Sequence, residues 1–475
     1  MTISPGADSP TRDPTGTVDL GEILPLLDRV PDFDVFPTVD EMTAAVEQLA
    51  QAHPEVASLR RIGTSRLGEP LVCLSVGTGD RAAIVVGMPH PNEPIGAHTA
   101  TYLARLLCED AELRESLGFT WHIVPCIDPD GTRLNEGWFK GPFTRTHYAR
   151  HFYRPAPDDQ VEWTFPFAYK TAYFDQVLPE TLALMRIIDD VRPAFVCSLH
   201  NAESGGVYYY LSRPAPGLYG ALHAIPEHLG LPLDKGEPEA SYAPLYATAI
   251  FGQLSRKEGY DYLEAAGQDP VPYESGESSS YWAGKYGALT LVSELPYWAD
   301  ANADDDTPTG DLYSDALRRQ ADGIDEAVDA MRTALSDAGD DLTLETPYLR
   351  ASRAFVDGLA SHASLSRWRA TQAEYARPAT VAERWSCNGV VHMYKTRFAG
   401  ILLRALEAQV DAGLASPAVR GAHRSLKEKF DRWCAEAEAD TPAETLPIRK
   451  LVATQLGAIL AAARYLDTER PSPDG

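Results

Sequence analysis

The sequence lacks long apolar runs, an excess of basic residues and an apolar N-terminal segment. No stretch approaches the roughly 20 apolar residues that a membrane-spanning helix requires, so we expect no membrane span. Lys and Arg number 42 against 68 Asp and Glu, for a formal net charge of −26. Nucleic acids and anionic membranes bind basic faces, so this balance argues against both as partners. Residues 1–19 are polar and Pro-rich, unlike a secretory signal peptide.

The chain has six cysteines, most of them inside apolar runs and none in a Cys-x-x-Cys pair. This usage is typical of reduced, buried side chains rather than of a disulfide framework or a zinc cluster. Together with the missing signal peptide, it predicts a cytoplasmic protein. At 475 residues and 44% apolar content, the chain is long enough for two or three domains.

Composition and periodicity divide the chain into four parts. Residues 1–35 are rich in Pro, Asp and Gly, which predicts a mobile tail with one short helix at residues 20–30. Residues 36–300 alternate apolar strands with helices, which predicts an α/β sheet with covered faces. Residues 301–310 form an acidic linker, and residues 311–470 show only helical spacing, so we expect an all-α C-terminal domain.

Several individual elements are also predicted. Helical spacing over residues 40–53 places Asp40 as the N-cap. A turn at residues 77–80 predicts a hairpin between the apolar runs 71–76 and 82–86. In the C-terminal part we expect helices over residues 312–335, 347–369, 380–410, 417–438 and 447–466.

A Pro-bracketed turn, MPHPNEP, directly follows the apolar run 82–86 and carries His90 and Glu93. His200 ends a second apolar run, residues 194–199. Ligands of open α/β sheets bind beyond the carboxyl ends of strands, so these three side chains are candidates for one site. Two histidines and a carboxylate leave a tetrahedral zinc with an open position, and we expect them to hold one Zn²⁺ per chain.

Glu294 closes a third apolar strand, residues 288–292. An ionised carboxylate at the end of so apolar a strand is costly unless it has a partner. A general base that activates water at the metal explains its position. The alternative is a rim carboxylate paired with Lys285 or an arginine. Weaker ligand candidates are His98, His122, His147 and His151.

From residue 38 to the His-x-x-Glu motif, the chain resembles the opening of the M14 zinc carboxypeptidase family. A helix ends in AHPEV at residues 52–56, and IGTSRLGEPL at residues 62–71 is similar to the family's Gly-x-Ser-x-x-Gly-x-Pro-Ile stretch. The resemblance continues to Glu294 and covers roughly residues 38–300. It implies a mixed, twisted sheet flanked by helices, and a metallocarboxypeptidase whose substrate is a peptide or small amide with a free carboxylate.

The resemblance also implies roles for single residues. Glu294 would take a proton from water and pass it to the leaving amine. The sequence DPDG at residues 128–131 resembles the family's Asn-Pro-Asp-Gly. Arg133, just after it, looks like the arginine that polarises the scissile carbonyl, a task that needs a cation facing the developing oxyanion.

Substrate binding is implied for three further residues. ARHF at residues 149–152 resembles the family's Asn-Arg-Asn-Phe, in which the arginine binds the terminal carboxylate, so Arg150 takes that role. Tyr273 lies close to the position of the family's mobile active-site tyrosine, and Asn201 follows the last zinc ligand. The alternatives to Arg150 are Arg145 and Arg154.

The chain departs from the family pattern at three positions. Ala149 replaces an Asn that helps to bind the carboxylate, and His147 stands where an Asp usually supports the first zinc histidine. Asn201 follows the last zinc ligand in place of the more usual Ser. Ser280 falls near the family's side-chain pocket, so no large apolar or acidic selector is evident there.

Two other interpretations of the same residues remain open. The strings His200-Asn201 and Asn92-Glu93-Pro94 also resemble the aspartoacylase and succinylglutamate desuccinylase relatives, so an N-acyl amino-acid amidohydrolase is the alternative activity. A catalytically inactive binding protein on the same scaffold is a third. The C-terminal helical domain is expected either to cover the cleft or to form a homo-oligomer.

Overall fold

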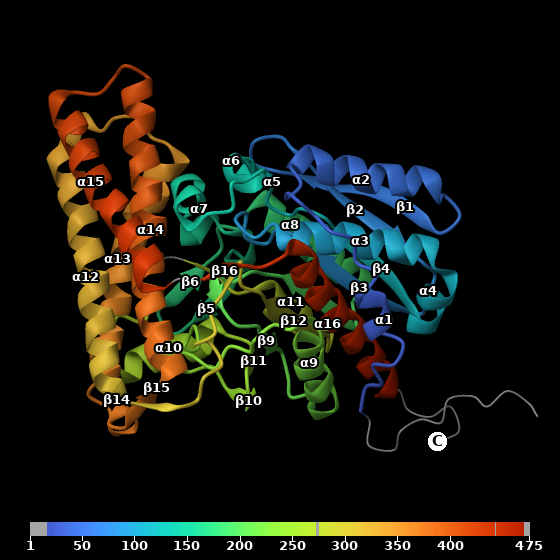
Figure 1. Cartoon of the computed structure of the whole chain (residues 1–475). Helices are drawn as coiled ribbons and strands as arrows, with labels where there is room; N and C mark the ends of the chain where they lie inside the picture. The colour runs from blue at the N-terminus through green and yellow to red at the C-terminus, as the bar shows by residue number, and fades with distance from the viewer. Residues whose placement is uncertain (1–16, 272–274, 442, 470–475) are drawn as a thin grey trace, which may run out of the picture.

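The computed structural model describes residues 17–271, 275–441 and 443–469 (Figure 1). Its centre is a nine-stranded mixed sheet of order β1-β2-β4-β3-β7-β12-β9-β11-β10, which confirms the expected α/β class. The strands are β1 (Ala57–Thr64), β2 (Pro70–Val76), β3 (Arg81–Val86), β4 (Phe119–Val124), β7 (Phe195–Leu199), β9 (Tyr208–Leu211), β10 (Leu245–Ala247), β11 (Ile250–Gly252) and β12 (Leu289–Glu294).

The central strands run parallel, so their carboxyl ends share one edge of the sheet. β3 pairs in parallel with β4 and β7, and β7 pairs in parallel with β12. The hairpin expected across residues 77–80 is wrong, because β4 lies between β2 and β3 and the hairpin partner of β2 is β1. A turn in the sequence indicates that two strands are connected, but it does not indicate which strands are hydrogen-bonded to each other in the sheet. β3 is apolar toward both faces, which suits an interior position between parallel neighbours.

Alternating side chains on the central strands build two cores, one on each face. On β3, Val85 joins the larger core, and Ile84 and Val86 join the smaller one. The larger core lies beneath α3 (Ile95–Glu109), α9 (Pro216–Leu229) and α16 (Ile448–Thr468). The smaller core lies beneath α8 (Pro179–Val191) and α11 (Ser279–Gly284). The last helix of the chain therefore packs on the sheet layers, against α3 and α9.

The N-terminal segment is packed from residue 17 onward. Ile23 and Leu27 are buried, and the short helix α1 (Leu24–Leu27) contacts α16. Residues 17–35 are thus part of the fold, although their composition suggested a tail, and residues 1–16 lie outside the described part. The next helix, α2 (Val39–Ala52), is capped by Thr38 in a capping box with Glu41, and not by Asp40 as expected.

The helices α12 (Tyr313–Ala338), α13 (Pro347–Arg369), α14 (Val381–Asp411) and α15 (Pro417–Asp440) form a bundle at one end of the molecule (Figure 1, left). Their bounds agree closely with the expected helices. α14 also packs against α7 (Arg145–His151). Gly400 permits this contact, because a Cβ there would lie 2.3 Å from the carbonyl oxygen of Ala149. The bundle is therefore fixed against the α/β part through α14.

Short elements connect these layers. The helices are α4 (Ala111–Leu117), α5 (Pro129–Arg133), α6 (Glu136–Phe139) and α10 (Arg256–Ala265), with 3₁₀ turns at Pro157–Asp159, Val161–Trp163, Gly339–Asp341 and Ala373–Tyr375. The strands are β5 (Phe167–Tyr169), β6 (Ala172–Phe174), β8 (Ser204–Gly205), β13 (Trp298–Ala299), β14 (Pro308–Leu312), β15 (Pro378–Thr380) and β16 (Glu444–Thr445).

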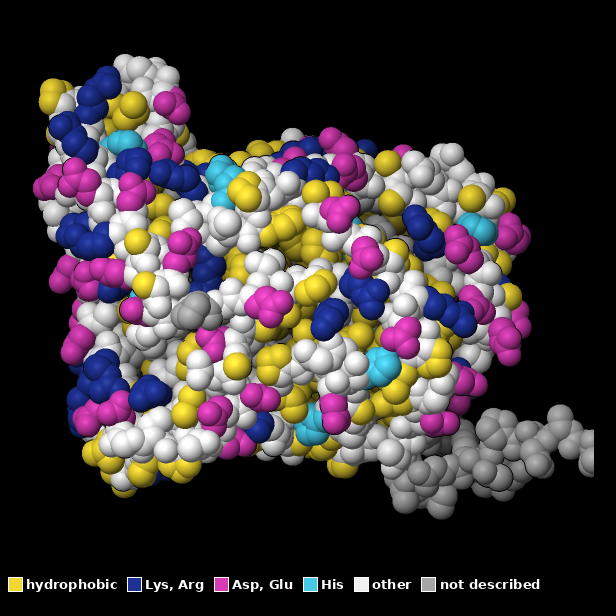
Figure 2. All heavy atoms as spheres, viewed as in Figure 1, with side chains coloured by type: hydrophobic (Ala, Val, Ile, Leu, Met, Phe, Trp, Pro, Cys, Tyr) yellow, Lys and Arg dark blue, Asp and Glu magenta, His cyan; other side chains and the backbone are white. Residues whose placement is uncertain are grey.

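The surface carries both signs of charge despite the acidic total. Figure 2 shows Lys and Arg interspersed with Asp and Glu over the outer face of the bundle. All six cysteines are buried and free, as expected from their place in apolar runs. Among the described residues, no helix combines the length and the apolar character needed to cross a bilayer.

Candidate active site and metal centre

Four side chains meet at the shared edge of the sheet. His90 and Glu93 lie in the turn between β3 and α3, His200 directly follows β7, and Glu294 is the last residue of β12. These strands are neighbours in the sheet, so their ends converge. Met88 opens the first turn with a φ of 54°, a backbone conformation that is costly for a non-glycine residue. All four functional side chains are buried.

Three of these residues present ligand atoms at one point. The Nδ1 atoms of His90 and His200 are 3.1 Å apart, and each lies 3.1 Å from Glu93 Oε2. Ligand atoms on a tetrahedral zinc, at about 2.0–2.1 Å from the metal, are separated by roughly 3.3 Å. Two imidazole nitrogens and a carboxylate oxygen at this spacing carry too few protons for each pair of atoms to form a hydrogen bond, whereas one cation can bind all three. The donor set therefore fits one zinc ion.

The protonation states of the ligands suit metal binding. Burial and the nearby charge of Arg154 lower the pKa of His90 to about 3, so its imidazole is neutral. Burial alone would raise the pKa of Glu93, but the two histidines hold it well below its usual value. Both groups are thus in the form that a cation needs.

The buried carboxylate of Glu162 orients His200 through the hydroxyl of Ser198, on the side of the ring away from Glu93. His200 Nε2 lies 2.9 Å from Ser198 Oγ, which lies 3.5 Å from Glu162 Oε2. Glu162 in turn accepts hydrogen bonds from the backbone and side chain of Ser279. This chain holds the Nε2 side of the ring and leaves Nδ1 for the metal. The corresponding Nε2 of His90 is buried and has no hydrogen-bond partner among the described residues.

Glu294 lies beside the ligands without belonging to them. Its Oε1 is 3.9 Å from His200 Nδ1. Burial raises the pKa of Glu294 well above its usual value, with further contributions from Glu239 and Glu93, while Arg154 and Arg397 act in the opposite direction. A carboxyl group with an elevated pKa next to a metal can take and return protons.

Arg154, which follows α7, is the arginine that hydrogen-bonds to Glu93. Its Nη1 donates to Glu93 Oε1 at 2.9 Å, and its Nε donates to Gln160. Arg133 lies elsewhere: it is one-third exposed and pairs with Glu69 at 2.6 Å and Asp40 at 2.8 Å. The short helix α5 turns Arg133 toward α2, and this contradicts the placement inferred from its position after the DPDG turn.

Arg150 is also placed away from the ligands. It faces the bundle, where it lies 3.5 Å from Glu407 and 3.7 Å from Asp431. If α7 continued, Arg154 would lie on the same face as Arg150, one turn further along. However, α7 ends at residue 151, and the chain then turns toward the site. This turn explains why Arg154, one of the two alternatives, reaches the metal ligands. The other alternative, Arg145, donates to Thr441.

The remaining candidates have mixed outcomes. Asn201 Oδ1 accepts hydrogen bonds from the Ile95 N–H and the Tyr297 hydroxyl, both at 3.2 Å, so it joins the two ligand loops and also lines the cavity. Tyr273 lies outside the described residues. His147 stacks on His151 of the same helix, 4.3 Å between ring centroids.

A cavity of about 480 Å³ opens onto Glu294 and the ligands. One wall comes from the α/β part and includes Ser280. The other wall comes from the bundle and includes His362 of α13 and Arg397 of α14. The C-terminal helices therefore complete the cavity, one of the two roles expected for them.

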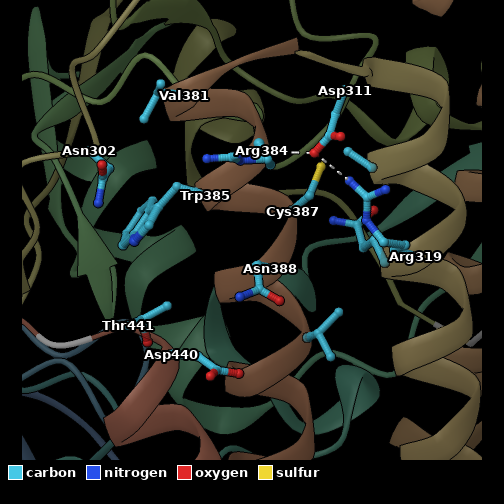
Figure 3. Close-up of a pocket in the computed structure, with 13 residues that line it drawn as sticks. Asn302, Asp311, Arg319, Val381, Arg384, Trp385, Cys387, Asn388, Asp440 and Thr441 are labelled. Atoms are coloured by element: carbon cyan, nitrogen blue, oxygen red, sulfur yellow. Dashed lines mark hydrogen bonds and ion pairs between the residues drawn. The ribbon is translucent and has the colours of Figure 1, made fainter. Parts of the chain in front are cut away.

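A second cavity, of about 420 Å³, lies between α12 and α14 (Figure 3). Its arginines are Arg319 and Arg384, and both pair with Asp311, at 3.3 and 3.6 Å. Trp385 lines both cavities. Among the described residues, the group of converging candidate metal ligands lines the first cavity and not the second.

Three charged residues that line the cavity were not predicted from the sequence. Glu162 lies in a region without periodicity, and Glu203 and Arg397 pair with each other across 194 positions. Arg397 occurs in a long helix, where an arginine usually indicates a solvated face. Glu203 lies only three residues after His200, a signal that the sequence did offer, whereas no spacing connects Glu162 or Arg397 with the two histidines.

The carboxyl group of Asp128, the N-cap of α5 in the DPDG turn, is fully buried. Its Oδ1 accepts the Gly131 N–H at 3.0 Å, while its buried Oδ2 has no hydrogen-bond partner among the described residues. Burial raises the pKa of Asp128 to about 7, against the opposing charge of Arg66. The unfolded carboxyl ionises near pH 3.8. Folding stability is therefore lost as the pH rises from about 4 to about 7.

We expect Asp128→Asn to raise the melting temperature at pH 8 and to change it little at pH 4. The amide keeps the cap and removes a buried charge whose cost is on the order of a few kcal/mol. Asp130→Asn is the matched control, because Asp130 accepts from Ser65 Oγ and the Leu67 N–H and loses an acceptor at either pH. Scanning fluorimetry measures both. A lower melting temperature of Asp128→Asn at pH 8 would contradict the raised pKa.

Comparisons with known proteins agree with the site. The profile of the zinc carboxypeptidase family, Peptidase_M14, matches residues 42–281, half of the chain. Zinc carboxypeptidase A 1 of Anopheles gambiae is 26% identical over 291 residues, 59% of this chain and 63% of the relative. Carboxypeptidase E of Caenorhabditis elegans is 32% identical over 110 residues, 20% of this chain and 23% of the relative.

Among solved structures, carboxypeptidase A from Helicoverpa armigera is 16% identical, with a TM-score of 0.39 over 75% of this chain and 82% of that chain. The protein belongs to the zinc carboxypeptidase family, a family of metal-dependent peptide hydrolases. It spans less than two thirds of the length of both curated relatives. The matched residues include all three candidate metal ligands and end before Glu294.

Proposed function

We propose that this protein is a zinc-dependent hydrolase that removes the C-terminal residue of a short peptide, or cleaves a related amide, with Glu294 as the general base. The observation that supports this most is the position of Glu294, 3.9 Å from His200 Nδ1 but outside the three converging ligand atoms. A free carboxylate next to a complete ligand set is the arrangement that hydrolysis by activated water needs.

His90, Glu93 and His200 would hold the zinc. Bound zinc would polarise the scissile carbonyl and make water more acidic. Glu294 would take a proton from the attacking water and give it to the nitrogen of the leaving amine. Ser198 keeps the ring of His200 fixed meanwhile, because its hydroxyl occupies Nε2.

Arg154 would meet the negative charge that develops on the carbonyl oxygen, the role inferred from the sequence for Arg133. We expect Arg154→Gln to lower kcat by roughly 10²–10³-fold, as does loss of one oxyanion donor. Arg133→Gln is the matched control and should stay close to wild type, because Arg133 is bound to Glu69 and Asp40. Steady-state kinetics and zinc content check both variants. Equal losses of kcat in the two would remove Arg154 from this role.

A small acylated amino acid is the second candidate substrate. The observation in its favour is the cavity, about 480 Å³ and walled by α13 and α14, which suits a small molecule better than the end of a long chain. The proposed zinc chemistry applies equally to its amide bond.

Hydrolysis of a mixed library tests the function. Zinc-loaded protein is incubated with dipeptides, longer peptides and N-acyl amino acids, and the products are identified by mass spectrometry. Release of single C-terminal residues is the expected result. Cleavage confined to N-acyl amino acids would establish the second candidate. Intact substrates throughout, at full zinc occupancy, would refute both.

A further inference from the structure

The cavity carries a cation and an anion on different walls, and we propose that its substrate is a small zwitterion whose carboxylate binds Arg397 and whose ammonium group binds Glu239. This inference rests on the proposed function and narrows its substrate class to dipeptides and similar aminoacyl compounds. It also gives the C-terminal bundle a direct part in substrate recognition.

Arg397 reaches the cavity from α14. Its Nε donates to Glu203, three residues after His200. Its Cζ lies 5.7 and 4.9 Å from the ring centroids of Tyr148 and Phe152, so two aromatic faces hold the guanidinium. In the part of the chain that the structure describes, Arg397 has no further ion-pair partner. The N–H groups of its η nitrogens can therefore bind a carboxylate in the bidentate manner of guanidinium.

The neighbouring arginines are committed to other groups. Arg369 donates through both η nitrogens to Glu237, at 2.6 and 3.1 Å. Arg154 donates to Glu93, and the proposed function already assigns it to the scissile carbonyl oxygen rather than to the substrate carboxylate. Gly400, one turn after Arg397, allows α14 to lie directly against α7 and so fixes the depth to which Arg397 enters. These contacts leave Arg397 as the preferred anchor for a substrate carboxylate.

Glu239 supplies the opposite charge. Its Oε1 accepts a hydrogen bond from the Tyr208 hydroxyl and its Oε2 one from the Tyr210 hydroxyl, each at 3.1 Å. Among the described residues no Lys or Arg pairs with it, and phenol groups do not neutralise a carboxylate. The rings of Tyr208, Tyr210 and Phe251 pack together beside it and offer faces that attract a cation.

The two charged groups flank the reacting centre without touching each other. Tyr208 pairs with Glu294 in the sheet, so Glu239 lies on the β9 side of the general base. Arg397 lies against Glu203, in the loop that follows the ligand His200. A molecule small enough for about 480 Å³ can contact both, and the amide bond that joins its two charged ends would then lie near the ligands.

Matched substrates separate the two contacts. A set of dipeptides is compared with the same dipeptides N-acetylated and with their C-terminal amides, on zinc-loaded protein. We expect wild type to prefer the free dipeptide over either blocked form by roughly tenfold or more in kcat/KM. Glu239→Gln should lose most of the preference for the free amine and keep that for the free carboxylate. Arg397→Gln should show the reverse.

Folding controls are needed because Arg397 and Glu203 are a buried pair. Arg397→Lys keeps the positive charge. The double variant Arg397→Gln with Glu203→Gln removes both charges of the pair, so neither is left buried without a partner. Arg150→Gln, whose arginine faces the bundle, should keep both preferences. Arg256 also lines the cavity. The inference is refuted if wild type cleaves N-acetyl dipeptides as well as free ones, or if Arg256→Gln rather than Arg397→Gln loses the carboxylate preference.

A binding measurement distinguishes failure of the inference from failure of the proposed function. Calorimetry on zinc-loaded Glu294→Gln protein compares the affinities of the free, N-acetylated and amidated dipeptides without turnover. Tighter binding of the free form supports the zwitterion site even if no peptide is hydrolysed. Equal affinities would refute the site, whatever activity the protein has.

Discussion

Glu294→Gln is expected to lower kcat by roughly 10²–10⁴-fold while the protein still binds one zinc per chain. The amide has the shape of the carboxylate but cannot accept a proton, and Glu294 is not one of the converging ligands. Loss of turnover without loss of metal would therefore isolate the base from the zinc site. Steady-state hydrolysis gives kcat, and plasma mass spectrometry gives the zinc content.

A second glutamate provides the control for this change. Glu264 is exposed on α10 and pairs with Lys170, so Glu264→Gln makes the same chemical change outside the cavity and should keep kcat. Wild-type turnover in Glu294→Gln would exclude Glu294 as the base. Loss of zinc from that variant would instead make Glu294 part of the metal site.

His200→Ala is expected to weaken zinc binding by more than about 100-fold and to abolish hydrolysis. Loss of an outer partner alone typically costs 10–100-fold in metal affinity, and this change removes a ligand itself. Zinc should also raise the melting temperature of wild type but not that of the variant, since a ligand that binds only the folded state stabilises it. Competition with a chromogenic chelator measures the affinity.

His223→Ala is the matched control for the metal site. His223 lies on α9, and its Nε2 is 2.8 Å from the carbonyl oxygen of Thr248, away from the cavity. Its loss should leave zinc affinity unchanged. If His200→Ala retained zinc with wild-type affinity, the three-ligand site would be refuted.

The sequence predicted the metal site because its information is local. Each ligand directly follows an apolar run, and buried parallel strands place their carboxyl ends together. His90, Glu93, His200 and Glu294 could thus be assigned to one edge before their strands had been paired. The helices of the bundle were equally predictable, since their spacing is regular and each has clear ends.

The arginines could not be assigned in this way. Arg133 ends the five-residue helix α5 and Arg154 lies in the irregular segment after α7, so the direction of each side chain depends on the local path of the backbone. Arg133 forms ion pairs with the carboxylates of Asp40 and Glu69, whereas the turn after α7 places Arg154 beside Glu93 in the site. Likewise, the turn at residues 77–80 showed a connection between two strands but not the strand that would insert between them.

The class of the protein, its candidate strand-end ligands and its helical C-terminal region could all be inferred from the sequence. This was possible because period, apolar runs and motif spacing are properties of neighbouring residues. Which arginines enter the cavity, and which helices form its far wall, depends on how the complete elements pack. Arg397 and Glu203 meet through the packing of α14 on α7, a contact between segments about 250 residues apart that depends on Gly400. Such contacts follow from shape complementarity between complete elements, and no local pattern encodes them.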